Sequence, residues 1–101
     1  MKFTVKFLTK AEMDMDEIEE YLSQFCTSTV RDFFTKLEEQ VFALEDTPYI
    51  CQPYEEDPFF RRMVVADYML FYSVDEARKL VLIHRIFHQS RDVIRYLFAN
   101  F

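Results

Sequence analysis

The first half of the chain changes from a strand-like to a helix-like spacing of apolar residues. In FTVKFL, residues 3–8, apolar and polar side chains alternate, which is the period of a half-buried strand. The spacing then becomes three and four, with a first apolar stripe of Ala11, Met15, Ile18, Leu22 and Phe25. After a break at CTST, residues 26–29, a second stripe contains Val30, Phe33, Phe34, Leu37, Val41 and Leu44. This pattern predicts a strand followed by two helices that pair as an antiparallel hairpin.

Polar residues near the first stripe refine this prediction. TKAE, residues 9–12, has the form of a capping box, in which Thr9 accepts from the first turn and Glu12 reaches back. Between the apolar positions lie Asp14, Asp16, Glu17, Glu19 and Glu20. We expect these carboxylates to form a solvated helix face and not an acid–base pair.

From residue 61 the period changes again. RRMVVAD, YMLFYSVD and KLVLIHRIFH are short runs rich in β-branched and aromatic residues, which predicts a three-stranded antiparallel meander. All three prolines precede it in a predicted loop, and Ser90 can cap a last short helix. The expected fold class is α+β in the order β-α-α-β-β-β-α, with the first strand in the later sheet and the helical hairpin on one face. Both faces of the strands are largely apolar, so we expect both faces of the sheet to be covered. The chain itself covers both, or a partner protein covers one of them.

A length of 101 residues predicts one folded domain, residues 1–101. The chain is 50% hydrophobic and 30% charged, which excludes a disordered chain, and no apolar run approaches the roughly 20 residues that span a bilayer. The N-terminus alternates and so differs from a signal peptide, which predicts a cytoplasmic protein without membrane contact. Cys26 and Cys51 lack the spacing of a zinc site, so we expect two semi-buried structural thiols and neither metal nor cofactor.

The net charge of −6 is unevenly distributed along the chain. Residues 1–60 hold 5 Lys/Arg and 14 Asp/Glu, giving −9, whereas residues 61–101 hold 7 and 4, giving +3. The acidic half is interpreted as a solvated outer surface, and the basic half could bind a polyanion.

Cations gather around one histidine near the C-terminus. In RIFHQSRDVIRYL, residues 85–97, His88 lies between Arg85 and Arg91. Arg85 and His88 have opposite strand parity, so a bend or bulge would be needed to bring both side chains to one site. The structural alternatives are an ordinary surface ion pair of Asp92 with Arg95 and, for His84, a hydrogen-bonded position within the sheet.

Several of these segments together are similar to a known family. Four segments resemble the RelE/ParE superfamily of toxins from type II toxin–antitoxin modules, also called plasmid stabilisation system toxins. They are YMLFYSVD (68–75), VLIHRIFH (81–88), Arg91-Asp92 and, in the first helix, Lys10-Ala11-Glu12 with Asp14 and Ile18. The resemblance covers nearly the whole chain. It implies a growth-arresting toxin that is held inactive in a hetero-oligomer by a cognate antitoxin, which lays a helix or strand over an apolar surface of the toxin.

The resemblance leaves the target open, because the superfamily includes ribosome-dependent mRNA endonucleases (mRNA interferases) and inhibitors of DNA gyrase on one scaffold. In an endonuclease, Arg62, Arg85 and Arg91 would supply positive charge to the phosphate and His88 would act as acid or base. Met69 stands where the endonucleases typically carry an arginine, and the H-x-x-R-D ending is similar to that of the gyrase-directed branch. We therefore favour a non-enzymatic gyrase inhibitor. The alternatives are an mRNA endonuclease acting on the translating ribosome and an antitoxin-binding remnant that has lost toxicity.

Overall fold

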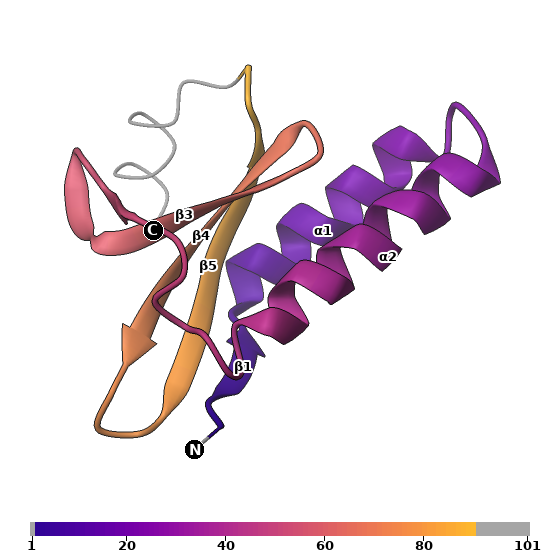
Figure 1. Cartoon of the computed structure of the whole chain (residues 1–101). Helices are drawn as coiled ribbons and strands as arrows, with labels where there is room; N and C mark the ends of the chain where they lie inside the picture. Colours follow the sequence, from indigo (N-terminus) through magenta and orange to yellow (C-terminus); the bar gives the residue numbers. More distant parts are fainter. Residues whose placement is uncertain (1, 91–101) are drawn as a thin grey trace.

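The computed structural model describes residues 2–90, and its elements follow the predicted order. They are β1 (Thr4–Phe7), α1 (Thr9–Leu22), α2 (Thr27–Ala43), β2 (Pro53–Tyr54), β3 (Asp57–Val65), β4 (Tyr68–Asp75) and β5 (Leu80–His88). The two helices pair as a hairpin beside a twisted sheet (Figure 1). This α+β arrangement confirms the predicted fold class and adds the two-residue strand β2. The predicted last helix lies outside the described residues.

The sheet joins the N-terminal strand to the later meander. Its five strands are ordered β1-β5-β4-β3-β2, and β1 runs parallel to β5, with Thr4 opposite Leu80 and Phe7 opposite Ile83. A parallel pair needs a long crossover connection, which the helical hairpin begins and the meander completes. The expectation that the first strand joins the later sheet is confirmed.

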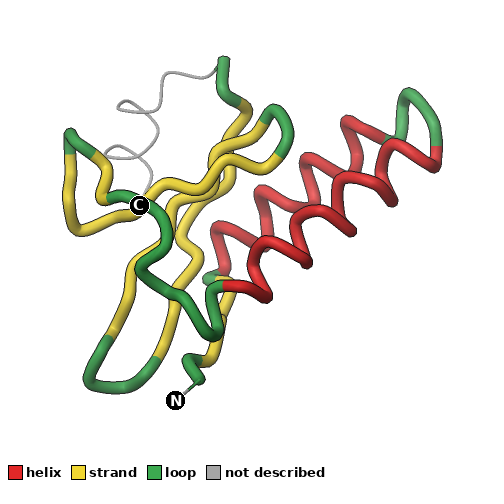
Figure 2. Tube along the Cα trace, in the orientation of Figure 1, coloured by secondary structure: helices red, strands yellow, loops and turns green. Residues whose placement is uncertain are grey.

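The main core lies between the helical hairpin and one face of the sheet. The apolar stripes of the two helices supply Ala11, Ile18, Phe33, Leu37, Val41 and Leu44. The sheet supplies, among others, Met63, Val65, Leu70, Tyr72, Val81, Ile83 and Ile86. Phe25 is an exception to the predicted stripe, because it is 63% exposed. It follows α1 at the end of the hairpin that projects beyond the sheet (Figure 2).

The opposite face of the sheet carries a smaller apolar cluster, as the two-sided strands predicted. It consists of Phe60, Met69, Phe71 and Phe87, with Tyr54 of β2 packed against it. The rings of Tyr54 and Phe71 meet edge to face with centroids 5.1 Å apart. Strand β2 is therefore short but contributes a side chain to this second core.

The predicted capping box at the start of α1 is wrong. The N-cap is Leu8, and it makes no side-chain cap hydrogen bond. The N–H of Leu8 donates to the carbonyl oxygen of Ile83 at 3.0 Å, so Leu8 still belongs to the β1–β5 pairing, while its own carbonyl accepts the N–H of Glu12 at 3.0 Å. Since the chain passes directly from strand to helix, Thr9 is already helical and cannot occupy the cap position.

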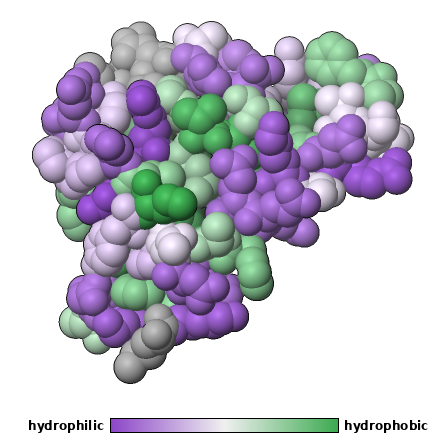
Figure 3. All heavy atoms as spheres, viewed as in Figure 1, coloured by the Kyte–Doolittle hydropathy of each residue, from purple (hydrophilic) through white to green (hydrophobic). Residues whose placement is uncertain are grey.

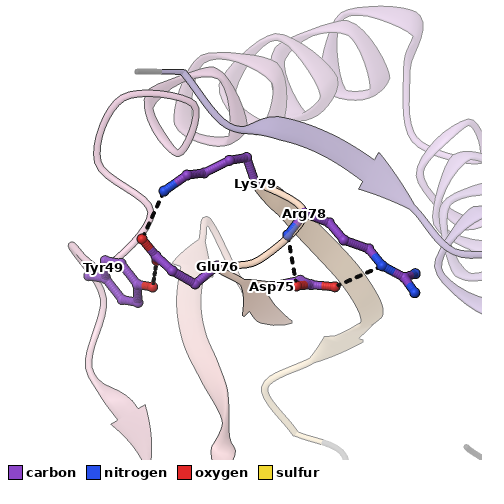
Figure 4. Close-up of polar contacts among 5 residues, drawn as sticks. All are labelled: Tyr49, Asp75, Glu76, Arg78 and Lys79. Carbon is purple, nitrogen blue, oxygen red and sulfur yellow. Dashed lines mark hydrogen bonds and ion pairs between the residues drawn. The ribbon is translucent and has the colours of Figure 1, made fainter.

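A polar network joins the β4–β5 turn to the loop before β2 (Figure 4). Lys79 Nζ lies 2.9 Å from Glu76 Oε1, Glu76 accepts the hydroxyl of Tyr49, and Arg78 lies close to Asp75. The hydrogen bond between Tyr49 and Glu76 raises the pKa of the tyrosine and lowers the pKa of the carboxyl. The network holds together two surface segments that are distant in sequence.

Candidate functional site

Arg85, one of the predicted site residues, forms a buried ion pair with Asp14 of α1. Its Nε lies 2.8 Å from Asp14 Oδ2 and its Nη2 lies 3.0 Å from Asp14 Oδ1, which is the two-bond geometry that a guanidinium and a carboxylate share. Arg85 is 8% exposed and Asp14 is 6% exposed. The guanidinium also lies over the ring of Phe87, 4.6 Å from its centroid. The positive charge of Arg85 is thus neutralised inside the protein.

The position of Asp14 follows from the end of β1. Strand β1 pairs with β5 only as far as Ile83, whereas β5 continues to His88. Beyond that point α1 runs beside β5, and Asp14 Oδ2 accepts the N–H of Ile86 at 2.9 Å. A carboxylate therefore occupies a place on the strand edge that a neighbouring strand would otherwise fill.

The resemblance included Asp14 in the first-helix pattern, but its pairing with Arg85 was missed, and the prediction that it belongs to a solvated helix face is wrong. Its spacing was the available signal, because Asp14 follows Ala11 by three residues and precedes Ile18 by four, so it shares their buried helix face. The sequence could not show that a buried carboxylate there has Arg85 as its partner, 71 residues away.

Arg62 lies exposed on β3, in the same cross-strand row as Arg85. Phe71 of β4 is paired with Arg62 on one side and with Arg85 on the other. Arg62 lines an open hollow of about 590 Å³ with residues of the β2–β3 region, including Glu55 and Glu56. Its guanidinium therefore faces solvent in a neighbourhood that also contains carboxylates.

Arg61 points to the other face, because successive side chains of a strand alternate. It is paired with Tyr72 of the main core. Its guanidinium donates to the carbonyl oxygen of Cys51 and lies 4.9 Å from the centroid of the Tyr49 ring. Arg61 thus fastens the loop before β2 and is separate from Arg62.

His88 ends β5 on the face that bears the helices. It is paired with Tyr68, and the two rings meet edge to face with centroids 5.2 Å apart. The N–H of Ser90 donates to His88 Nδ1 at 3.1 Å, and Ser90 Oγ lies 2.8 Å from the same nitrogen. Because a backbone N–H can only donate, Nδ1 is the acceptor and the neutral ring carries its proton on Nε2.

The predicted site residues do not converge in the described part of the chain. A bulge does occur between β4 and β5, because Tyr72 is opposite Ile83 while Phe71 is opposite Arg85, which leaves His84 as the extra residue. This bulge precedes both Arg85 and His88, so it leaves their opposite parity unchanged. Arg62 and Arg85 share a row, His88 lies on the other face, and Arg91 lies outside the described residues.

His84 has a structural environment. Its Nε2 lies 2.8 Å from Ser73 Oγ, and its ring meets that of Phe60 edge to face at 5.0 Å. Burial lowers the pKa of His84, which favours the neutral ring. This agrees with the interpretation of His84 as a hydrogen-bonded residue of the sheet.

Comparison with known families identifies the chain. The family model described as "ParE toxin of type II toxin-antitoxin system, parDE" matches residues 5–93. The chain belongs to this family. It is therefore a toxin component of a type II toxin–antitoxin system, as the resemblance implied. Comparison with curated proteins gives no match.

Solved structures from toxin–antitoxin systems share the fold. A chain of the chromosomal ParDE system of P. aeruginosa has a TM-score of 0.73 at 21% identity, covering 86% of this chain and 96% of that one. A chain of the RelBE2 complex of Mycobacterium tuberculosis has a TM-score of 0.64 at 21% identity, covering 87% and 99%. A chain of the intact E. coli RelBE complex has a TM-score of 0.63 at 13% identity, covering 88% and 99%. Since ParDE and RelBE proteins both match, the fold does not select a target.

No helix within residues 2–90 combines the length and the apolar character needed to cross a membrane.

Proposed function

We propose that this ParE-family toxin inhibits DNA gyrase by binding it, without breaking a bond, and that a cognate antitoxin neutralises it. The observation that carries the proposal is the separation of the residues that an RNA-cleaving site would need. Arg85 is paired with Asp14, and His88 lies on the opposite face of the sheet from the row that contains Arg62. The family match to ParE toxins over residues 5–93 supports the same target.

The energetics of the ion pair argue against Arg85 as a phosphate ligand. Moving its guanidinium to a substrate would leave the Asp14 carboxylate buried without a counter-charge, at a cost of about 3–5 kcal/mol. Met69, at the position where the endonucleases typically carry an arginine, is 8% exposed and packs in the apolar cluster behind the sheet. Strand β4 therefore presents no cation at that place.

The direct test compares the two targets with purified toxin. We expect loss of gyrase-catalysed supercoiling in a plasmid assay and intact mRNA in a purified translation system. Arg62→Ala and His88→Ala should leave inhibition of supercoiling in place. Rapid translation arrest with cut transcripts, abolished by either substitution, would refute the proposal.

The mRNA endonuclease is the second candidate, and the placement of two residues favours it. Arg62 is exposed, and His88 lies at the end of a strand with a proton on Nε2. In this candidate mechanism the phosphate charge is stabilised by Arg62, Arg85 and Arg91, and His88 transfers a proton. Loss of His88 is therefore expected to abolish cleavage.

The third alternative, an antitoxin-binding remnant, predicts unhindered growth on induction.

The partner can be tested independently of the target. Both ParDE and RelBE relatives were solved as toxin–antitoxin systems or complexes. We expect the protein encoded beside this chain to co-purify with it as a stable hetero-oligomer. Failure of any adjacent gene product to bind would contradict this part of the proposal.

A further inference from the structure

The outward face of α1 combines exposed apolar side chains with a carboxylate. Met13, Glu17 and Tyr21 are spaced four residues apart and so lie along one face of the helix. Met13 is 61% exposed and Tyr21 is 52% exposed. The Tyr21 ring meets the exposed ring of Phe25 edge to face at 5.4 Å. Figure 3 shows hydrophobic side chains at the projecting end of the hairpin.

The other carboxylates of α1 carry charge that the described chain does not compensate. Within residues 2–90, Asp14 is the one carboxylate of α1 that forms an ion pair. Glu19 and Glu20 lie in the last turn, which contains no basic residue. Negative charge at a helix C-terminus is unfavourable because it meets the negative end of the helix dipole. A positively charged partner would offset this repulsion.

A cavity opens beside this face. It has a volume of about 300 Å³ and lies between α1 and the end of β5. Its buried floor is made by Ile18, Tyr68, Ile86 and Phe87. Glu17 and Tyr21 of α1 line it on one side, and His88 and Ser90 line it on the other. This volume is at the small end of ligand pockets, so it suits one long side chain and not a helix.

The lining selects a cation with an apolar stem. Tyr21 lines the cavity and, at 52% exposed, offers an aromatic ring on which a guanidinium stacks well. Asp14 also lines the cavity, but Arg85 already neutralises it, so the free negative charge that an incoming group meets is that of Glu17. An arginine side chain would bury its methylenes on the floor and pair with Glu17.

We propose that the α1 face formed by Met13, Glu17 and Tyr21, with the adjoining cavity, is the docking surface for a basic segment of the antitoxin, which inserts an arginine beside Glu17. The inference rests on the proposed function for the existence of that antitoxin. Charge complementarity carries the choice of occupant, since α1 itself holds six carboxylates and one lysine, and of the six only Asp14 has an ion-pair partner within residues 2–90.

The test measures affinity between the full-length toxin and the antitoxin encoded beside it by isothermal titration calorimetry. We expect Glu17→Gln to weaken binding by about fivefold or more and Tyr21→Ala by about tenfold, as losses of a partly buried charge partner and of an aromatic contact. Glu39→Gln removes the same charge from an exposed position of α2 and should change affinity less than about twofold. Circular dichroism of each variant confirms that the fold is retained.

Salt dependence gives a second readout. The dissociation constant of the unaltered complex should rise with salt, and Glu17→Gln should reduce that slope while Glu39→Gln leaves it unchanged. Full-strength binding by both α1 variants would overturn the inference while leaving the antitoxin, and the proposed function, in place. Loss of gyrase inhibition with unchanged antitoxin binding would also overturn it. Absence of any antitoxin binding by the unaltered toxin would reject both, because the partner itself would be missing.

Discussion

At the residue scale, backbone strain within residues 2–90 is concentrated in two turns, at Ala66 and Lys79, and the chain has no glycine. Ala66 has φ 53°, in the two-residue turn between the paired residues Val65 and Tyr68. The left-handed region costs a residue with a Cβ roughly 1–2 kcal/mol, and glycine avoids this cost but loses more chain entropy on folding. Ala66 is therefore the position where a glycine is expected to help.

We expect Ala66→Gly to raise the free energy of unfolding by about 0.5–1 kcal/mol, measured by urea denaturation. The matched control is Ala77→Gly in the β4–β5 turn, because Ala77 is exposed and does not have a positive φ. That control should be neutral or slightly destabilising. A less stable Ala66→Gly protein would contradict the prediction.

Cys26 provides a second prediction at this scale, because it is exposed, and the expectation of a semi-buried thiol at this position is wrong. Its Sγ lies 3.0 Å from the hydroxyl oxygens of Ser28 and Thr29 at the start of α2. The hydrogen bond of the Ser28 side chain, followed by that of Thr29, lowers the pKa of the thiol from 9.0 to about 7. Since the thiolate is the reactive form, alkylation should accelerate as the pH rises through about 7.

The measurement is the rate of iodoacetamide modification against pH in a Cys51→Ser background, so that one thiol reacts. Ser28→Ala should raise the pKa and move the midpoint of the rate profile to higher pH. Ser23→Ala is the control, because the Ser23 hydroxyl donates to the Glu20 carbonyl oxygen and does not contact Cys26. A midpoint that stays in place in Ser28→Ala would show that this hydroxyl does not stabilise the thiolate.

At the element scale, the Asp14–Arg85 pair fastens α1 to the end of β5. Removing one partner leaves the other charge buried, so we expect Asp14→Asn and Arg85→Gln each to lower the free energy of unfolding by about 3–5 kcal/mol. The double variant should cost less than the sum of the two, because no charge is left unpaired. Chemical denaturation of the three variants measures this coupling.

Additive losses in that cycle would mean that the pair contributes through packing alone. The control is Lys2→Ala, which removes an exposed ion pair with Glu45 at 3.7 Å and should change stability by less than about 1 kcal/mol.

The elements also show what the sequence could and could not predict. The helices and the strands β1, β3, β4 and β5 follow from local periodicity, because their buried faces repeat every 3.6 or two residues. Strand β2 was missed, since it has two residues and exists only through pairing with β3. The cap of α1 and the burial of Asp14 depend on Ile83, Arg85 and Ile86, which lie some seventy residues away and leave no local signal.

For the candidate site, the sequence located the right segment but could not decide how its side chains are used. His88 was correctly expected at a strand end, and the parity argument correctly separated it from Arg85. The ion pair of Arg85 was not predictable, because an arginine in an apolar strand looks the same whether its partner is a phosphate or a buried aspartate.

At the scale of the whole molecule, neutralisation of Arg85 makes the charge distribution still less favourable for nucleic acid. The chain has a net charge of −6, and one of the seven cations of residues 61–101 is bound internally to Asp14. Affinity for single-stranded RNA comes largely from phosphate contacts and released counterions. The free toxin should therefore repel a polyanion at most orientations of approach.

We expect fluorescence anisotropy to detect no binding of the free toxin to a labelled single-stranded RNA at physiological salt, in the range up to about 10 μM where non-specific binders are already detected. Glu55→Lys and Glu56→Lys together should create weak, salt-sensitive binding, because they surround the exposed Arg62 with positive charge. Glu38→Lys with Glu39→Lys on α2 makes the same change in net charge away from Arg62. A different outcome would favour the endonuclease: the unaltered toxin binds RNA, and Arg62→Ala abolishes that binding. A single exposed arginine would then anchor the phosphate backbone despite the acidic surroundings.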